Sequence, residues 1–273
     1  MIRVLGDDGD EDSSIDLTKE VDGVFESGGW LEQVLDFDHR QEQAQMAASV
    51  CRSLVRGEHL LFEAGTGVGK SLAYLVPAIL FAKERKRPCV VATNTISLQE
   101  QLLGKDIPAL RELLKEIPNL SQWADFKCAL LVGRANYLCS TRLRKTMAGQ
   151  SELFEGGQRD ELQRIAQWSD TEAREGIRQE LSPSPMGAVW DAVNADSSIC
   201  SSKRCSPDTC FYRRAREAVD RADLVIVNHS LLFSLIGAGF GPRDEDEGVL
   251  FADDFVVFDE AHEMPDVASE HLG

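Results

Sequence analysis

The sequence predicts an α/β fold in which a parallel sheet is interrupted by an inserted, mainly helical module. Short apolar runs, each suited to a buried strand of a parallel sheet, alternate with segments of helical periodicity. Residues 140–220 break this alternation, because they are polar and helix-rich. The five apolar runs cover residues 59–63, 89–93, 129–132, 224–227 and 255–258.

Length and composition limit the class of protein. The chain has 273 residues, of which 43% are hydrophobic, enough for about two domains with a buried core. Its longest apolar run, residues 72–82, is shorter than the roughly 20 residues that a helix needs to cross a bilayer. The start of the chain has neither the basic segment nor the apolar segment of a secretory signal. We therefore expect a cytoplasmic protein without a membrane partner.

Charge is distributed unevenly along the chain. A net charge of −17 would argue against a nucleic-acid binder if it were spread evenly. Residues 1–38 carry twelve acidic and two basic residues, and residues 241–273 carry eleven and one. Each of these ends contributes −10, so residues 39–240 have a net charge of +3. A weakly basic central part is compatible with contacts to a nucleic-acid backbone. Residues 237–248 are expected to be an exposed acidic loop.

Helices are expected between the strands. We expect residues 1–27 to be an acidic tail without regular structure, because they are rich in charge and poor in aromatic side chains. Residues 41–55 have the periodicity of an amphipathic helix. A second helix begins at Ser71 and should kink at Pro77, and a short third helix covers residues 97–103.

A glycine-rich segment between the first strand and the following helix predicts a phosphate site. Small residues let backbone N–H groups converge on phosphate oxygens, and the helix N-terminus adds a positive dipole. Lys70 would reach the β- and γ-phosphates of ATP, and the Ser71 hydroxyl would bind Mg²⁺. Ala64 stands where a first glycine is usual, and the alternative is a purely structural turn. The segment consists of Ala64, Gly65, Thr66, Gly67, Val68, Gly69, Lys70 and Ser71.

An acidic pair follows the last apolar run, in the order Asp-Glu-Ala-His. A carboxylate at the carboxyl end of a parallel strand faces the crevice in which ligands of open α/β sheets bind. Asp259 would hold Mg²⁺ through water, and Glu260 would orient and deprotonate the attacking water. With Lys70, these are the candidate catalytic residues, whereas His262 is expected to couple the site to neighbouring segments. The alternative is an acidic cap on a strand.

Four of the seven cysteines have a spacing that indicates a bound metal group. Cys139 is followed, after 60 residues, by Cys200, Cys205 and Cys210, with four residues between successive thiols. A [4Fe–4S] cluster takes one cysteine per iron, whereas zinc ligands normally come as closely spaced pairs. The spacing favours the cluster, with a zinc site and scattered core thiols as alternatives. The other three cysteines lie in apolar surroundings and are expected in the core: Cys51, Cys89 and Cys128.

Taken together, the sequences AGTGVGKS and DEAH resemble those of superfamily 2 helicases, in which alanine opens the phosphate loop. Residues 40–46 are similar to the segment with which such helicases contact adenine, and Arg40 and Gln43 occupy its matching positions. Residues 92–102 are similar to the motif Ia that touches a single strand of DNA, with Thr93 and Gln99 as candidates. The alternatives are a surface position for Gln43, a strand end for Thr93 and a helix cap for Gln99.

A second set of motifs resembles the iron–sulfur helicases of the DinG/XPD group, and the bacterial DinG/YoaA type most of all. These are GRANYLC at residues 133–139, the three later cysteines and ADLVIVNHSLL at residues 222–232. The resemblance covers about residues 28–265. It implies an ATP-dependent DNA helicase that works 5′→3′ on single-stranded or branched DNA in repair and replication.

The resemblance also implies a domain organisation. Residues 28–133 and 223–273 would form a RecA-like motor lobe, and residues 134–222 would be the [4Fe–4S] insertion, with a structural role for the cluster. A basic stretch just after Cys210 would contact the DNA backbone, with neighbouring aromatic rings stacking on bases, or would be a solvated helix face. It consists of Phe211, Tyr212, Arg213, Arg214 and Arg216.

Complete helicases of this group continue with an arch and a second motor lobe, which we do not find in the sequence. We expect the chain to be a fragment or to need a partner chain, and alone to bind nucleotide, hydrolyse it slowly and unwind nothing. Two other functions compete with this one. They are a regulatory P-loop ATPase with a zinc-binding insertion, and a nucleotide- and redox-responsive binding protein that does not translocate.

Overall fold

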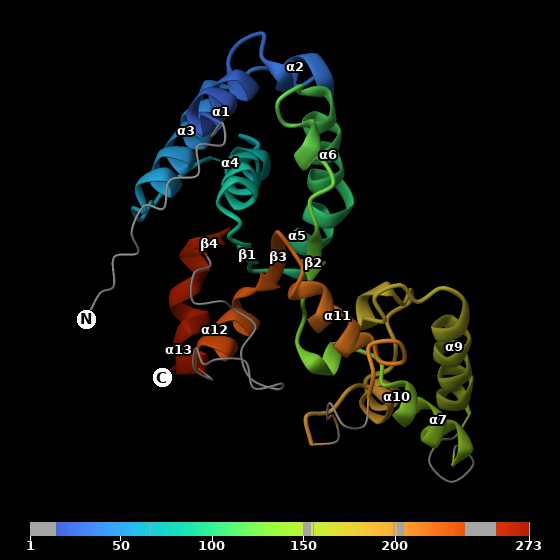
Figure 1. The fold of residues 1–273 in the computed structure, drawn as a ribbon. Helices are drawn as coiled ribbons and strands as arrows, with labels where there is room; N and C mark the ends of the chain where they lie inside the picture. Colours follow the sequence, from blue (N-terminus) through green and yellow to red (C-terminus); the bar gives the residue numbers. More distant parts are fainter. Residues whose placement is uncertain are drawn as a thin grey trace. The chain divides into compact units, whose positions relative to one another are not determined.

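A computed structural model describes residues 15–65, 67–149, 154, 156–198, 200, 205–237 and 255–272 (Figure 1). The chain divides into two compact units. The first comprises the described residues up to 87 together with residues 102–126, and the second comprises residues 88–101 with the described residues from 127 onward. No helix in the described part of the chain is long and apolar enough to span a membrane.

The first unit is helical. Helices α3 and α4 pack along each other, and α1 packs against α3. Between Leu72 and Ala82 every residue of α4 is buried, and the helix continues through Pro77. The elements are α1 (Leu17–Phe25), α2 (Trp30–Leu35), α3 (Gln41–Arg56), α4 (Lys70–Arg85), the π-helical η1 (Leu102–Asp106), α6 (Ile107–Glu116) and the short η2 (Ser121–Trp123).

Helix α1 corrects the expectation of an irregular tail over residues 1–27. The Asp16 carboxylate caps the helix by accepting a hydrogen bond from the Lys19 N–H, at 3.2 Å. Val21, Val24 and Phe25 are buried on one face, spaced as on a single helix stripe. The acidic composition obscured this stripe, so the expectation is wrong for residues 17–25. Residues 1–14 lie outside the described part of the chain.

The strand expected at residues 59–63 is absent from the described structure. The segment has no regular secondary structure, and Leu61 is 90% exposed. An apolar run forms a strand only where neighbouring backbone is available to pair with it. None of the strand pairs in the described structure includes this segment, so the prediction from the apolar run is wrong.

The second unit contains a parallel sheet with the strand order β2-β3-β1-β4. Val91 in β1 lies opposite Ile226 in β3 and Val257 in β4. The first four residues of β3 and all of β1 are buried, as expected for strands covered on both faces. These strands confirm four of the five predicted runs. They are β1 (Cys89–Thr93), β2 (Cys128–Leu130), β3 (Leu224–Asn228) and β4 (Phe255–Phe258).

Helices fill the sequence between β2 and β3, as predicted. Helices α7, α9 and α10 pack together around Trp168 and Trp190 (Figure 1). Trp190 donates its indole N–H to the Ala135 carbonyl, at 2.8 Å. The elements are η3 (Arg134–Asn136), α7 (Ser140–Ala148), α9 (Gly157–Thr171), η4 (Arg178–Glu180), α10 (Gly187–Val193) and α11 (Phe211–Val219).

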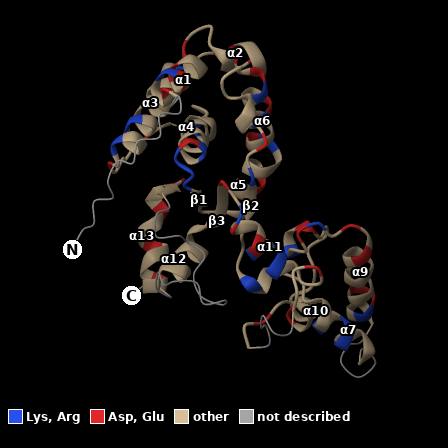
Figure 2. Cartoon of the chain, viewed as in Figure 1, with Lys and Arg blue, Asp and Glu red and all other residues tan. Residues whose placement is uncertain are grey.

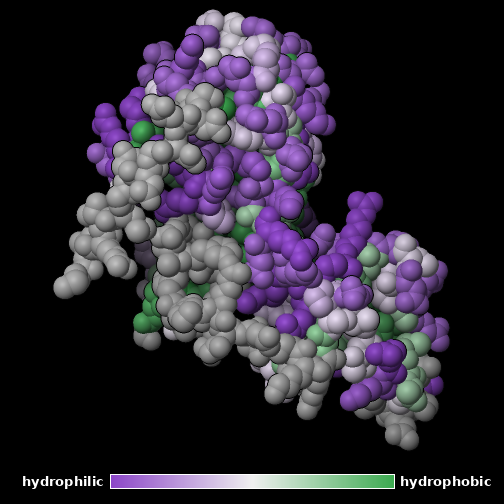
Figure 3. Space-filling model, viewed as in Figure 1, coloured by the Kyte–Doolittle hydropathy of each residue, from purple (hydrophilic) through white to green (hydrophobic). Residues whose placement is uncertain are grey.

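The remaining helices of the second unit border the sheet. Helix α5 (Ile96–Gln101) follows β1, α12 (His229–Gly237) follows β3, and α13 (Met264–Leu272) follows β4 after the short η5 (Ala261–Glu263). Helices α12 and α13 pack against each other. The acidic loop expected at residues 237–248 lies outside the described residues, except for Gly237 at the end of α12. On the face shown in Figure 3, the described surface is mostly hydrophilic.

Candidate functional site

The glycine-rich loop has a backbone that only glycine adopts readily. Gly67 and Gly69 both have positive φ, +80° and +87°. A Cβ atom added at Gly69 would also collide with the side-chain amide of Gln43. Glycine is therefore needed at position 69 for two reasons, its backbone angle and the space around it. Thr66, in the middle of the predicted phosphate loop, lies outside the described residues.

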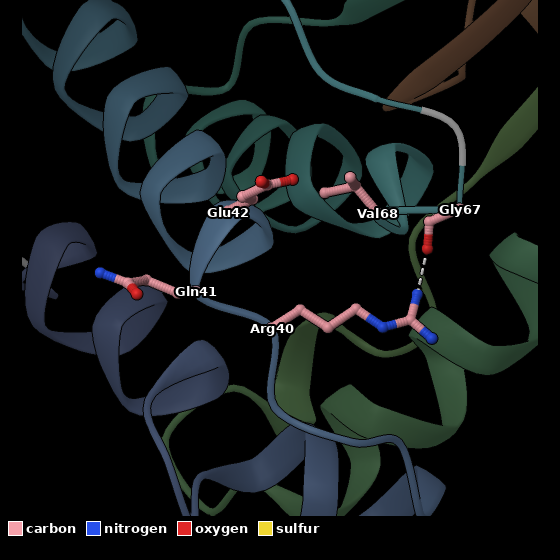
Figure 4. A pocket seen from close by; sticks show the side chains of 5 residues that line it. All are labelled: Arg40, Gln41, Glu42, Gly67 and Val68. Atoms are coloured by element: carbon pink, nitrogen blue, oxygen red, sulfur yellow. Dashed lines mark hydrogen bonds between the residues drawn. The ribbon is translucent and has the colours of Figure 1, made fainter.

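Arg40 and Gln43 contact the backbone of this loop. The Gln43 amide donates a hydrogen bond to the Gly69 carbonyl, at 2.9 Å, and the Arg40 guanidinium donates one to the Gly67 carbonyl (Figure 4). Gln43 is only 4% exposed, so the alternative of an ordinary surface residue is wrong. The two residues expected to bind adenine thus lie against the loop expected to bind phosphate.

A cavity of about 430 Å³ lies at this contact. Figure 4 shows the Arg40 side chain reaching from the start of α3 across to the loop. The volume is within the range of small-molecule sites, roughly 300–1,000 Å³. The cavity is lined by Arg40, Gln41, Glu42, Gly67 and Val68.

Lys70 and Ser71 are the first two residues of α4, and both are half-buried. Helix α4 has 16 residues, and its first N–H groups have no partner within the helix. Such an N-terminus attracts anions through its free N–H groups and its dipole. The loop, the helix N-terminus and the ammonium group of Lys70 together form an arrangement suited to a polyphosphate.

The acidic pair follows β4 in the second unit. The Asp259 N–H donates to the Ala92 carbonyl of β1, at 2.8 Å, which continues the strand pairing by one residue. Glu260 has φ of +55°, a left-handed conformation that is rare for residues other than glycine, and its N–H donates to the Asp259 carboxylate, at 3.1 Å. Strained backbone of this kind concentrates at functional sites.

His262 lies beside two carboxylates of its own segment. Its Nδ1 is 3.5 Å from Glu260 Oε2, and its Nε2 is 3.2 Å from Glu263 Oε1. These contacts connect His262 to the acidic pair rather than to a neighbouring segment. The role expected for it as a coupling residue stays a prediction. Lys70 belongs to the first unit, whereas Asp259 and Glu260 belong to the second.

Two of the four spaced cysteines, Cys200 and Cys210, have thiols with a raised pKa. Burial raises the pKa of the Cys200 thiol, and Cys139 and Cys205 raise it further. Burial likewise raises the pKa of the Cys210 thiol, with added contributions from the other three. Cys139 and Cys200 pack in the same core cluster, and the Ser140 hydroxyl, next to Cys139, donates to the Thr209 carbonyl, next to Cys210, at 3.1 Å. Cys139 and Cys210 precede α7 and α11, at the N-cap positions.

These thiols do not form a site for a single metal ion as they stand. Among the described residues, no group of three or more His, Cys, Asp or Glu side chains is placed to hold one. All seven cysteines are free thiols, so none is used in a disulfide. Cys51 and Cys89 are buried, as expected of core thiols, whereas Cys128 is only half-buried.

The basic stretch after Cys210 lies on α11 (Figure 2). Arg214 lies over the Phe211 ring, 4.8 Å from its centroid, and Arg134 lies over the Tyr212 ring at the same distance. Both rings are half-buried and each already packs against an arginine. This arrangement favours backbone contacts by the arginines over base stacking by the two rings.

The two motif Ia candidates are buried. Thr93 is fully buried and donates its hydroxyl to the Thr95 carbonyl, at 3.3 Å, and Gln99 is 2% exposed. The Thr95 hydroxyl, and not Gln99, caps the start of α5, by accepting from the Leu98 N–H at 3.3 Å. Thr93 therefore fits the alternative of a strand end. The alternative of a helix cap is wrong for Gln99, because Thr95 caps the helix.

Sequence reasoning gave no role to His229, the first residue of α12. It is 1% exposed, and its ring contacts the Ala92 carbonyl, at 3.2 Å. The available signal was a pair of polar residues, Asn228 and His229, directly after the apolar run 224–227.

Comparisons with known proteins agree with the motifs. Residues 41–133 match the family model described as DEAD/DEAH box helicase, and residues 103–273, more than half of the chain, match the model DEAD_2. The chain is similar to the ATP-dependent DNA helicase YoaA of Haemophilus influenzae, with 32% identity over 264 residues, 95% of this chain and 38% of the relative.

Two further relatives bear related names. The chain is 37% identical over 242 residues to the ATP-dependent helicase DinG of Mycobacterium tuberculosis, covering 83% of this chain and 34% of the relative. It is 33% identical over 241 residues to the 3′-5′ exonuclease DinG of Bacillus subtilis, covering 87% of this chain and 24% of the relative. The chain thus spans between 24% and 38% of the length of these curated relatives.

Proposed function

The chain belongs to the helicase family that the DEAD and DEAD_2 models describe, and we propose that it is the ATP-binding and iron–sulfur part of an ATP-dependent DNA helicase. One observation carries the proposal. In the loop before α4, Gly67 and Gly69 have positive φ, and Arg40 and Gln43 donate to their carbonyls, the Arg40–Gly67 contact lining a cavity. The helicase names of the similar proteins support the same function.

ATP would bind along this loop, from Ala64 to Ser71. The backbone N–H groups would hold the β- and γ-phosphates, with the Lys70 ammonium group neutralising their charge. The cavity beside Arg40 and Gln43 would take the adenine base, for which its volume of about 430 Å³ leaves room. Arg40 lines this cavity and would contact the base, whereas Gln43, whose amide donates to the Gly69 carbonyl, would contact it from α3.

Hydrolysis would depend on the acidic pair at the end of β4. Mg²⁺, held by the Ser71 hydroxyl and through water by Asp259, would neutralise charge on the phosphates. Glu260 would orient the attacking water and accept its proton. Its left-handed backbone fixes the direction of its side chain relative to β4, which suits a residue that must hold water in one geometry.

Residues 28–133 and 223–273 would form the RecA-like lobe, with residues 134–222 as the insertion. Single-stranded or branched DNA would be the substrate, with movement 5′→3′ and a role in repair and replication. The arginines of α11 support a DNA contact on the insertion. A cavity of about 330 Å³, between α5 and the η3 and η4 segments, lies between the motif Ia helix and that insertion.

Cys139, Cys200, Cys205 and Cys210 would hold a [4Fe–4S] cluster. The fit rests on the surroundings of these thiols: Cys139 and Cys200 pack in one core cluster, and the Ser140 hydroxyl, next to Cys139, donates to the Thr209 carbonyl, next to Cys210. Because each thiolate binds a different iron, ligands of such a cluster lie farther apart than those of a single ion. Two of the thiols, Cys139 and Cys210, directly precede α7 and α11. The cluster would pin the insertion in place.

Metal analysis tests the cluster. The protein, purified without oxygen, should contain about four irons and four acid-labile sulfides per chain. Cys200→Ser should lose them, whereas Cys128→Ser, a half-buried thiol outside the set, should keep them. Stoichiometric zinc without sulfide would overturn the cluster and favour a zinc-binding insertion.

A further inference from the structure

One glycine contacts the neighbours of two cysteines that are far apart in the sequence. The Gly176 carbonyl accepts a hydrogen bond from the N–H of Leu138, the residue before Cys139, at 2.8 Å. The ring of Phe211, the residue after Cys210, lies so close to Gly176 that an added Cβ atom would collide with it. Gly176 therefore lies between the segments that carry these two cysteines.

The position of Gly176 requires a glycine. The residue is buried and has φ of +70°, in the left-handed region that side chains other than hydrogen rarely adopt. A larger residue would have to displace the Phe211 ring, which belongs to the first turn of α11. The close approach of this turn to α11 thus depends on the missing side chain.

A single carboxylate holds the turn that contains Gly176. The half-buried Glu180 accepts hydrogen bonds from three successive backbone N–H groups, at 3.2, 2.8 and 3.2 Å. They belong to Arg174, Glu175 and Gly176. Hydrogen bonds to a carboxylate are stronger than those between neutral groups. The Arg214 guanidinium of α11 also donates to the Arg174 carbonyl, which attaches the same turn to this helix a second time.

Both cysteines are buried, so the backbone around them decides where their thiols lie. On its other side, the segment that leads into Cys139 is held by the Cys139 N–H, which donates to the Val193 carbonyl at 2.8 Å. Groups that orient the ligands of a metal site, without binding the metal themselves, affect metal affinity strongly. The turn at Gly176 is in a position to orient two such ligands at once.

We propose that Glu180 is a positioning residue for the iron–sulfur cluster, which acts through the turn at Gly176 to hold Cys139 and Cys210 at the spacing that the cluster requires. The contacts of this turn are made by the protein alone, so they place the two cysteines before any metal binds. The inference rests on the proposed cluster, and it assigns a role to a carboxylate that is not itself a ligand.

The experiment measures iron retention in the full-length protein, purified without oxygen. Glu180→Ala removes the carboxylate, whereas the amide oxygen of Glu180→Gln can still accept hydrogen bonds from the turn. Glu161→Ala is the matched control, because Glu161 is another carboxylate of the insertion that accepts from a side chain and a backbone N–H. Its partners, Arg164 at 2.8 Å and Met186 at 3.3 Å, are not next to a cysteine. For each protein we measure iron and acid-labile sulfide per chain, the rate of iron loss to a chelator, and thermal unfolding.

We expect Glu180→Ala to lose iron at least about tenfold faster than wild type, and Glu161→Ala to stay within about twofold of it. Glu180→Gln should lose iron more slowly than Glu180→Ala. An iron content and rate of Glu180→Ala within twofold of wild type would overturn the inference.

Equal acceleration in Glu161→Ala would also overturn the inference, because a general loss of stability in the insertion would then be the cause. If Glu180→Ala does not fold, an unchanged rate in a folded Glu180→Gln would overturn it instead. Wild-type protein without iron and sulfide would contradict the proposed cluster itself.

Discussion

Replacement of Gly69 by alanine tests the geometry of the phosphate loop. At φ of +87° an alanine is strained by about 1–2 kcal/mol. Its Cβ would also displace the Gln43 amide, with loss of the bond to the Gly69 carbonyl, worth about 1 kcal/mol. The loop is therefore expected to leave its observed conformation in the variant, and nucleotide binding would have to restore it.

The total of about 2–3 kcal/mol corresponds to a roughly 30- to 150-fold weaker affinity for ATP. Calorimetric titration of Mg-ATP into both proteins measures it. Gly57→Ala is the matched control, because Gly57 has a similar φ of +66° but nothing within 4 Å of an added Cβ. That variant should lose about 1 kcal/mol of stability and keep its affinity. Affinity of Gly69→Ala within twofold of wild type would refute the reasoning.

Four further predictions follow from the same structure. Gln43→Ala should weaken ATP binding about fivefold by loss of one hydrogen bond, measured by titration, whereas the exposed Gln45→Ala on the same helix should not. Phe25→Ala should lower the free energy of unfolding by about 3 kcal/mol in urea if α1 is packed, against less than about 0.5 kcal/mol for the exposed Val55→Ala. The Arg164 guanidinium lowers the pKa of Glu161, so their pair stabilises the fold at neutral pH and is lost as pH falls through that pKa. Glu161→Gln should therefore cost up to about 1 kcal/mol at pH 7 in urea unfolding, and this cost should decrease as the pH falls below the ordinary pKa of a glutamate. The 273-residue chain alone should bind ATP in the same titrations and give no strand displacement, and DNA-stimulated unwinding by it would contradict this.

Local sequence patterns were sufficient to predict the four strands of the sheet and the glycine-rich loop before α4. Four of the apolar runs form strands, and the two that are most buried, β1 and β3, contain two valines each, because β-branched residues without alternation suit strands covered on both faces. The run at residues 59–63 is also apolar but contains no β-branched residue, and it is not a strand. Strand formation depends on a pairing partner, and no feature of a short segment reveals one.

Contacts between distant residues could not be predicted from spacing. The bond between Gln43 and Gly69 joins residues 26 positions apart, and the contact of His229 with Ala92 joins residues 137 apart. Both depend on how helices and strands pack. The cysteine spacing indicated a shared site, but the packing of Cys139 and Cys200 in one core cluster depends on the fold.

Strand displacement by the full-length protein tests the central claim most directly. We predict that, with Mg-ATP, it separates a DNA duplex carrying a 5′ single-stranded tail, and that Glu260→Gln abolishes this while nucleotide still binds. A protein that binds ATP and contains the cluster, yet separates no duplex with a tail of either polarity, would contradict the claim.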